Sequence, residues 1–218
     1  MKTLIFQVKI GELAGYVYGF DNAPNLFEKH LMPTVQRYCN KHGYDYLEIT
    51  DFPKDHECTW FNYSGKKNKA STLVRYLSMN KEYDRIVSLD NDIWIPEHAE
   101  PLPDIDGHYA VIDQYGKTFV NGGVQMVDRK TGKLIYQHFA NICKDKTPPI
   151  NGHWSDQSYL NHWRSLNKKS SHLLDKKWNY MVSCHKRSSN YENANFIHYA
   201  GREARPLLIE DISKGIIQ

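Results

Sequence analysis

The sequence predicts an α/β fold with three layers, in which a mostly parallel sheet lies between helices. Two observations predict it. Apolar strand-like segments alternate with helix-like segments over the first 95 residues, and neither repeats nor low-complexity linkers divide the chain of 218 residues. Alternation of this kind is typical of parallel sheets built from crossover units.

The front half contains five expected elements, in the order strand, helix, strand, helix, strand. The first helix contains Pro33, where we expect a bend, and ends at Gly43, a residue suited to a left-handed C-cap. The order is typical of a Rossmann-like, nucleotide-binding half. The expected ranges are 3–10, 25–43, 44–50, 68–83 and 84–95.

Beyond residue 95 the pattern changes. A proline-rich stretch is expected to be irregular, and strand character returns around a glycine pair. Two helices with apolar periodicity and two segments of short strands follow. The expected ranges are 118–128 for the strand, 132–145 and 155–166 for the helices, and 171–181 and 195–201 for the short strands. We interpret 1–218 as one domain.

Composition excludes several classes of function. Lysine and arginine number 28 against 25 acidic residues, which does not indicate a general nucleic-acid binder but suits an anionic small molecule such as a nucleotide. The four cysteines are widely spaced, so neither a disulfide framework nor a cysteine zinc site is expected. No segment resembles a membrane span or a signal peptide, and we expect a cytoplasmic protein.

Asp90 and Asp92 interrupt the apolar run Val87–Ile95. In an extended chain alternate residues point the same way, so both carboxylates can address one cation. Oxygen ligands suit Mg²⁺ or Mn²⁺, and open α/β sheets bind ligands at the carboxyl ends of their strands. From these residues alone, a solvated turn or neutralisation by basic partners explains the pair as well.

His198 lies in the apolar segment Phe196–Gly201. A histidine in such a segment is most often a core residue with satisfied hydrogen bonds. Beside an aspartate pair that lacks a third protein ligand, a neutral imidazole is also a candidate metal ligand. Downstream, Arg202 and Arg205 are candidates for contacts with phosphate oxygens.

Three further segments contain candidate binding residues. Gly122 and Gly123 lie between apolar strand residues, which favours either close approach of a ligand to bare backbone or a plain bulge. Asp156 and Gln157 open a predicted helix, where Asp156 also fits as a stabiliser of the helix N-terminus. Basic residues on or before the helix that leads to the aspartate pair either are solvated or bind an anion: Lys66, Lys67, Lys69 and Arg75.

The order and spacing of these segments resemble the GT-A glycosyltransferases, in particular their retaining, glycogenin-like and galactosyltransferase-like members. DND stands where that family has its DxD motif. VNGGVQMV is similar to the family's N-S-G-V segment, SDQSYLN to its DQ…N helix start, and LDKKWN to its L-p-x-x-W/Y-N segment. HYAGREARP resembles the closing H-x-x-G…K-P motif, whose histidine is a metal ligand.

The resemblance covers nearly the whole chain, with three departures. NGG, residues 121–123, replaces the commoner NSG. Arg205 stands one position beyond the usual lysine, and Leu207 replaces the usual tryptophan. The compact length resembles transferases of bacteria or of large DNA viruses of algae, which for a viral protein implies the host cytoplasm.

The resemblance implies a metal-dependent transferase that moves a sugar from a nucleotide-sugar donor, most simply a UDP-sugar, to a glycan or glycoprotein acceptor. Residues 1–95 would bind the donor and 96–218 the acceptor. Mn²⁺ or Mg²⁺ would be held by Asp90, Asp92 and His198.

The resemblance also implies the other donor contacts. Asp156 and Gln157 would act near the anomeric carbon, and their pattern, with His198, favours retention over inversion. The other implied donor-binding residues are Gln7 and Val8 at the base, Asn91 near the ribose, Asn121, Gly122 and Gly123 at the sugar, Lys69, Arg75 and Arg202 at the phosphates, and Gly201, which permits close backbone approach.

Two alternatives belong to other classes of function. A sugar nucleotidyltransferase normally has a glycine-rich phosphate loop with a basic partner after the first strand, and the segment KIGELAGYVYG has no such run. A nucleotide-sugar-binding domain without catalysis is disfavoured by the retained Asp90, Asp92 and His198.

Overall fold

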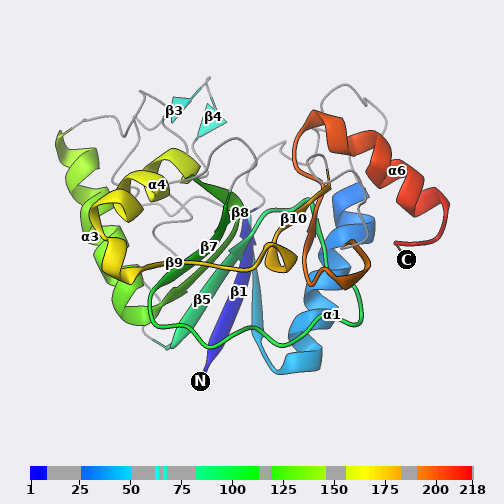
Figure 1. The fold of residues 1–218 in the computed structure, drawn as a ribbon, viewed down its shortest axis with the longest axis horizontal. Helices are drawn as coiled ribbons and strands as arrows, with labels where there is room; N and C mark the ends of the chain where they lie inside the picture. The colour runs from blue at the N-terminus through cyan, green and yellow to red at the C-terminus, as the bar shows by residue number, and fades with distance from the viewer. Residues whose placement is uncertain are drawn as a thin grey trace.

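A six-stranded mixed sheet forms the centre of the molecule, as the computed structural model shows (Figure 1). The structure describes residues 1–8, 26–50, 62–63, 66–67, 82–112, 119–145, 156–182 and 191–217. The strand order is β2-β1-β5-β8-β7-β9. Helix α1 lies on one face of this sheet, and helices α3 and α4 lie on the other. The predicted three-layer α/β class is therefore confirmed.

The first half of the sheet is parallel, as the β-α-β pattern predicts. Strands β2, β1 and β5 pair in parallel, β8 runs antiparallel to β5, β7 runs antiparallel to β8, and β9 is parallel to β7. Their bounds are β1 Thr3–Val8, β2 Asp45–Ile49, β5 Arg85–Leu89, β7 His108–Ile112, β8 Val120–Asp128 and β9 Ser171–Leu173.

The single strand expected over 84–95 is wrong, because the chain there forms two strands in two different sheets. Strand β5 ends at Leu89, a turn follows, and β6 (Ile93–Trp94) joins a small sheet of order β10-β11-β6 with β10 (Tyr180–Met181) and β11 (Ile197–His198). The aspartate pair lies in the turn between the two sheets. A continuous apolar pattern cannot reveal such a change of sheet.

The helices agree with the expected ranges with three differences. A π-helical turn, η2 (Phe27–Leu31), precedes α1 (Met32–His42), which contains Pro33 in its first turn and ends at Gly43 with φ of 68°. Helix α3 begins before the expected residue 132, because the Asp128 carboxylate accepts from the Thr131 N–H (2.6 Å) and caps the helix. The C-terminal helix α6 was not predicted. The bounds are α3 Arg129–Asp145, α4 Asp156–Leu166 and α6 Arg205–Ser213.

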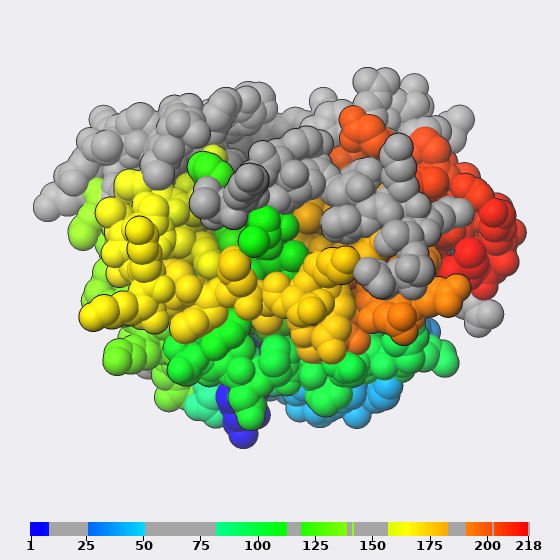
Figure 2. Space-filling model, viewed as in Figure 1, coloured from blue at the N-terminus to red at the C-terminus, as the bar shows by residue number. Residues whose placement is uncertain are grey.

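Short elements complete the described chain. The hairpin β3 (Asn62–Tyr63) and β4 (Lys66–Lys67) forms a separate two-stranded sheet, and the expected helix over 68–83 lies almost wholly outside the described residues. The 3₁₀ helices are η4 Lys168–Ser170, η5 Lys176–Trp178, η6 Tyr191–Asn193 and η7 Arg202–Ala204. On the face shown in Figure 2, the yellow-to-orange segment from α4 to β10 runs across the middle of the molecule.

Alternate residues of the central strands bury opposite faces of the sheet. Val87 and Leu89 of β5 pack with Val124 and Met126 of β8 in an apolar cluster that includes the buried face of α1. Gln125, between the last two, faces the α4 side through its contact with His108. None of the helices in the described ranges combines the length and apolarity needed to cross a bilayer.

A buried polar network joins α4 to the sheet. The Arg164 guanidinium donates to His108 Nδ1 (2.9 Å), His108 Nε2 contacts Gln125 Oε1, and Gln125 Nε2 donates to the Asn121 carbonyl (2.6 Å). Because arginine can only donate, His108 accepts at Nδ1 and carries its hydrogen on Nε2. Burial, together with the charge of Arg164, lowers the pKa of His108 to about 3.

This network predicts a loss of stability in mild acid. The pKa of His108 is lower in the folded chain than its ordinary value of 6.5. The unfolded chain therefore takes up this proton first, and the contribution present above pH 6.5 falls towards pH 3 by about 1.4 kcal/mol per pH unit. Urea unfolding of the wild type and of His108→Gln from neutral to acidic pH measures the difference. Parallel pH profiles of the two proteins would contradict the prediction.

Candidate metal site at the carboxyl edge of the sheet

The topology brings the ends of three strands to one edge of the sheet. Strands β1 and β5 are parallel, so Gln7 and Leu89 pair near their carboxyl ends, and the antiparallel β8 starts at the same edge, where Leu89 pairs with Val124. Asp90 continues this arrangement, because its N–H donates to the Gly123 carbonyl (2.9 Å). The prediction that the aspartate pair lies at the end of a buried strand is confirmed.

Asp90, Asp92 and His198 form one cluster. His198 Nε2 lies 3.0 Å from Asp92 Oδ1 and 3.8 Å from Asp90 Oδ2, and one potential ligand atom from each residue lies within 4.8 Å of the others. The His198 side chain is 3% exposed, Asp92 13% and Asp90 29%, so the cluster opens to solvent on the Asp90 side. One nitrogen and two carboxylate ligands suit a divalent cation with positions left for a substrate.

The small sheet brings the histidine to the aspartates. His198 on β11 pairs with Ile93 on β6, the first residue after the Asp-Asn-Asp turn. The next residue, Tyr199, donates its N–H to the Asp92 carbonyl (2.9 Å). Backbone hydrogen bonds thus hold the turn after β5 against β11, which lies more than 100 residues later in the sequence.

The environment of the His198 ring is charged but almost dry. Burial alone lowers the pKa of His198, yet the negative charges of Asp92 and Asp90 outweigh burial and raise it above its ordinary value. The cluster therefore attracts a cation, and either a proton on His198 or a metal ion satisfies it.

The absence of a side chain at Gly123 leaves room for the imidazole of His198. A Cβ on Gly123 would lie 2.3 Å from His198 Cε1 and 2.6 Å from Nδ1, closer than van der Waals contact allows. The pattern of two glycines in an apolar strand did indicate a close approach to bare backbone. The group that approaches Gly123 is the imidazole of His198, and a contact of Gly123 with a donor sugar stays a prediction.

Arg205 neutralises part of the negative charge. It is buried, donates from Nη2 to Asp92 Oδ2 (3.0 Å) and from Nη1 to the Tyr199 carbonyl (2.9 Å), and its guanidinium lies 4.5 Å from the centre of the Phe27 ring. The expectation that Arg205 meets phosphate oxygens is wrong, because two of its nitrogens are already bonded inside the protein. Arg205 therefore neutralises part of the charge of the aspartates within the same cluster that forms the candidate cation site.

Gln7 lies beneath the site. It is fully buried, donates from Nε2 to the Asp90 carbonyl (3.0 Å) and accepts at Oε1 from the Tyr46 hydroxyl (2.9 Å). Gln7 thus supports the backbone of Asp90, which differs from the predicted contact of its side chain with a base. Asn91 donates to the Val8 carbonyl (2.9 Å), and its buried Oδ1 has no hydrogen-bond partner among the described residues.

The N-terminus of α4 is fastened to the start of β8. The Gly122 N–H donates to Gln157 Oε1 (3.0 Å), one turn before Asn161, which accepts from the Val120 N–H (2.8 Å) and donates to its carbonyl (2.9 Å). The structure thus brings together Gly122 and Gln157, which the resemblance assigned to the donor sugar, and their contacts with a sugar stay predictions. Asp156 begins α4, and its side chain is not among those described.

The remaining predicted residues are placed only in part. Lys69 and Arg75 lie outside the described residues, and Arg202 is placed only as part of η7. Gly201 adopts φ of 78°, a left-handed conformation that favours glycine.

Sequence reasoning assigned no role to Asn179, whose Oδ1 lies 2.9 Å from His198 Nδ1. Its place after Trp178 in LDKKWN was the only signal.

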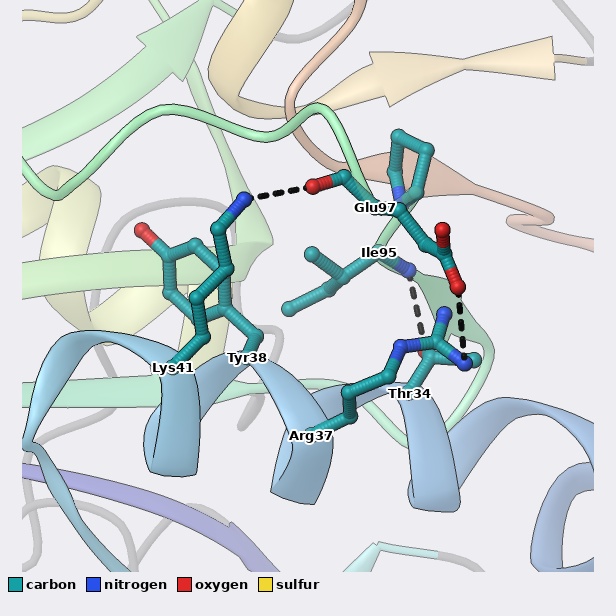
Figure 3. A pocket seen from close by; sticks show the side chains of 7 residues that line it. Thr34, Arg37, Tyr38, Lys41, Ile95 and Glu97 are labelled. Carbon is teal, nitrogen blue, oxygen red and sulfur yellow. Dashed lines mark hydrogen bonds and ion pairs between the residues drawn. The ribbon is translucent and has the colours of Figure 1, made fainter.

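A separate pocket of about 370 Å³ lies between α1 and the segment after β6 (Figure 3). Its two basic side chains are engaged there, since Lys41 Nζ donates to the Glu97 carbonyl (2.6 Å) and Arg37 lies 4.0 Å from the Glu97 carboxylate. None of the predicted site residues lines this pocket. It is lined by Thr34, Arg37, Tyr38, Lys41, Ile95, Pro96 and Glu97.

Solved structures share this arrangement of strands and helices. A glycosyltransferase involved in the glycosylation of the major capsid of PBCV-1 matches with a TM-score of 0.63 at 15% identity, covering 94% of this chain and 97% of that one. An active-site mutant of LgtC matches with a TM-score of 0.57 at 13% identity, covering 97% and 95% of the two chains. The chain has the fold of the GT-A glycosyltransferases.

A third structure has the same fold. The glycosyltransferase GlyE of Streptococcus pneumoniae TIGR4 matches with a TM-score of 0.53 at 14% identity, over 100% of this chain and 66% of GlyE. No protein-family model and no curated protein matches the chain. The GT-A resemblance read from the sequence motifs is thus confirmed at the level of the fold.

The contact between Gly123 and His198 leads to a prediction. In Gly123→Ala the new methyl group must displace the imidazole, so we expect Mn²⁺ affinity to fall and stability to drop by about 1–3 kcal/mol. Calorimetric titration with Mn²⁺ and thermal unfolding measure the two effects. Gly107→Ala is the matched control, because its Cβ would lie 2.8 Å from the Ser170 carbonyl, far in the fold from the cluster. Wild-type Mn²⁺ affinity in Gly123→Ala would count against the assignment.

The ion pair between Arg205 and Asp92 leads to a second prediction about this site. Arg205→Met leaves the Asp92 carboxylate without its buried cation, and we expect the protein to lose about 3–5 kcal/mol of stability. A divalent ion then offsets more negative charge in the variant than in the wild type. The rise in unfolding temperature with added Mn²⁺ should therefore be larger in Arg205→Met, and an equal or smaller rise would refute this account.

Proposed function

We propose that this chain is a metal-dependent glycosyltransferase that transfers a sugar from a nucleotide-sugar donor, a UDP-sugar, to a glycan or protein-linked acceptor. The observation that carries the proposal is the Asp90, Asp92 and His198 cluster at the carboxyl edge of a GT-A sheet. Ligands bind at this edge in open α/β sheets. The glycosyltransferase folds that match the chain, among them LgtC with donor and acceptor sugar analogues bound, support the same reading.

The donor set of the cluster fits Mn²⁺ or Mg²⁺. The carboxylates of Asp90 and Asp92 and the imidazole of His198 would hold the ion, which supplies positive charge to a diphosphate leaving group as the glycosidic bond breaks. Asp90 is the most exposed of the three and lies at the open side, where a substrate would approach. Nearly complete burial of His198 keeps that side of the cluster dry and its interactions strong.

The chain's own residues would orient the donor around this point. Asn91 lies beside the end of β1 and has a buried oxygen without a hydrogen-bond partner among the described residues, and we assign this side chain to a ribose hydroxyl. Gln157 and Gly122, held together at the start of α4, would border the sugar, with Asp156 next to them. Basic side chains at Lys69, Arg75 and Arg202 would add charge at the phosphates, and Gly201 would let the backbone approach.

We propose transfer with retention of the anomeric configuration. No carboxylate within the described cluster is left over as a nucleophile, because Asp90 and Asp92 face His198. A front-face displacement needs no protein nucleophile, and the leaving phosphate oxygen can take the acceptor's proton. Asp156 and Gln157 are the residues we assign to stabilising the transition state. We place the reaction in the cytoplasm.

Nucleotide binding tests the metal-dependent part. We expect UDP to bind in the presence of Mn²⁺ or Mg²⁺, and the affinity to fall at least about 100-fold in Asp92→Asn, since even a residue behind a metal ligand accounts for 10–100-fold. Calorimetry measures both. The matched control is Asp84→Asn at the opposite end of β5, where Asp84 pairs with Arg129 on the surface. Unchanged, metal-independent UDP binding in Asp92→Asn would exclude the proposed site.

A screen of nucleotide sugars tests the reaction itself. With the correct donor and Mn²⁺ we expect slow hydrolysis, transfer to an added acceptor sugar, and a product whose anomeric configuration, read by NMR, equals that of the donor. Binding of donors without hydrolysis or transfer would support the non-catalytic alternative. Release of pyrophosphate from a nucleoside triphosphate and a sugar phosphate would support a nucleotidyltransferase.

A further inference from the structure

A chain of buried hydrogen bonds fixes which nitrogen of His198 carries its hydrogen. The chain starts at a backbone group that has only one possible role: the Gly123 N–H donates to Asn121 Oδ1 (2.8 Å). An amide N–H cannot accept, so the Asn121 atom that faces it must be the oxygen. This contact settles the orientation of the Asn121 carboxamide independently of all other side chains.

The orientation of Asn121 in turn determines the orientation of the Asn179 carboxamide. Its Nδ2 donates to the same Asn121 Oδ1 (2.8 Å), because an oxygen facing an oxygen would repel. The other end of the Asn179 carboxamide, Oδ1, therefore faces His198 Nδ1 (2.9 Å). Asn179 is fully buried, so water does not compete for these positions.

The consequence for His198 follows from the chemistry of the oxygen. A carboxamide oxygen only accepts, so Nδ1 of His198 must carry the hydrogen. In the neutral ring Nε2 is then left with a lone pair. This lone pair faces Asp92 Oδ1 at 3.0 Å and Asp90 Oδ2 at 3.8 Å, so the centre of the cluster is lined by acceptors from three residues.

We propose that Asn179 is a positioning residue that makes His198 a metal ligand. It holds the hydrogen on Nδ1 and turns Nε2 towards the aspartates. Without it, the neutral ring would gain by placing the hydrogen on Nε2 and donating it to Asp92, which would close the site with an internal hydrogen bond. The inference rests on the metal site of the proposed function, but not on the identity of the sugar or acceptor.

The partners behind a ligating histidine commonly account for 10–100-fold in metal affinity. Here the support extends beyond one side chain. Asn121, at the start of β8, also accepts at its backbone carbonyl from Gln125, which belongs to the network with His108 and Arg164. The orientation of the ring thus depends on β8 and on the segment before β10, not only on β11.

NMR of the metal-free protein tests the tautomer directly. In ¹⁵N-labelled protein at alkaline pH, the two-bond nitrogen–hydrogen correlations of His198 should give the Nδ1–H pattern in the wild type. In Asn179→Leu, which keeps the volume and removes the acceptor, the pattern should shift towards Nε2–H. An Nε2–H pattern in the wild type would overturn the inference.

Calorimetric titration with Mn²⁺ tests the consequence. We expect a 10–100-fold weaker affinity in Asn179→Leu, and a smaller loss in Asn179→Asp, whose carboxylate still accepts from Nδ1. Asn195→Leu is the matched control: it removes another buried asparagine with two hydrogen bonds, both to Glu100. It should lower stability and leave the Mn²⁺ affinity unchanged.

The outcomes separate this inference from the proposed function. If Asn179→Leu binds Mn²⁺ with the same affinity as the wild type, only the proposed role of Asn179 is overturned. A wild type that binds neither Mn²⁺ nor Mg²⁺ would overturn the proposed metal-dependent function. If Asn179→Leu does not fold, the wild-type tautomer and the Asn179→Asp titration still decide.

Discussion

The structure around the site depends on one constraint: the carboxylate oxygens of Asp90 and Asp92 and, when the ring is neutral, Nε2 of His198 face one another as acceptor atoms in a nearly buried place. Such atoms repel unless a cation lies between them. Their positions are therefore maintained by contacts from outside the cluster. Backbone hydrogen bonds hold Asp90 to β8 and Tyr199 to Asp92, and side chains behind them hold the rest.

The charges indicate why the arrangement suits an anionic substrate. Asp90 and Asp92 contribute two negative charges, and Arg205 balances one of them through Asp92. A divalent ion beside a neutral His198 would leave the site with about one positive charge facing outwards, which favours a diphosphate. A site without Arg205 would be electrically neutral after binding the ion. Under the proposed function, the buried arginine would therefore contribute to substrate binding without touching the substrate.

The two sheets contribute different parts of this site. The six-stranded sheet leads into the turn that contains the aspartates and forms a rigid floor, since Gln7 on the neighbouring strand supports Asp90. The small sheet supplies His198, and α6 begins with Arg205 directly beyond it. Helix α4 fixes the start of β8 through Gln157 and Asn161. Displacement of any of these elements would separate ligands that only their packing brings together.

The sequence by itself determined the class of fold, the parallel half of the sheet and the place of the aspartate pair, because strand and helix periodicities and apolar runs are local properties. It also supplied His198 and the glycine pair as candidates through motif order. Only the tertiary structure decided that the run over 84–95 changes sheet, that Gly123 makes room for an imidazole, and that Arg205 turns inwards to Asp92. Asn179 is the clearest case. Its role rests on hydrogen bonds to residues 58 and 19 positions away, and contacts over such separations leave no periodic trace in one sequence.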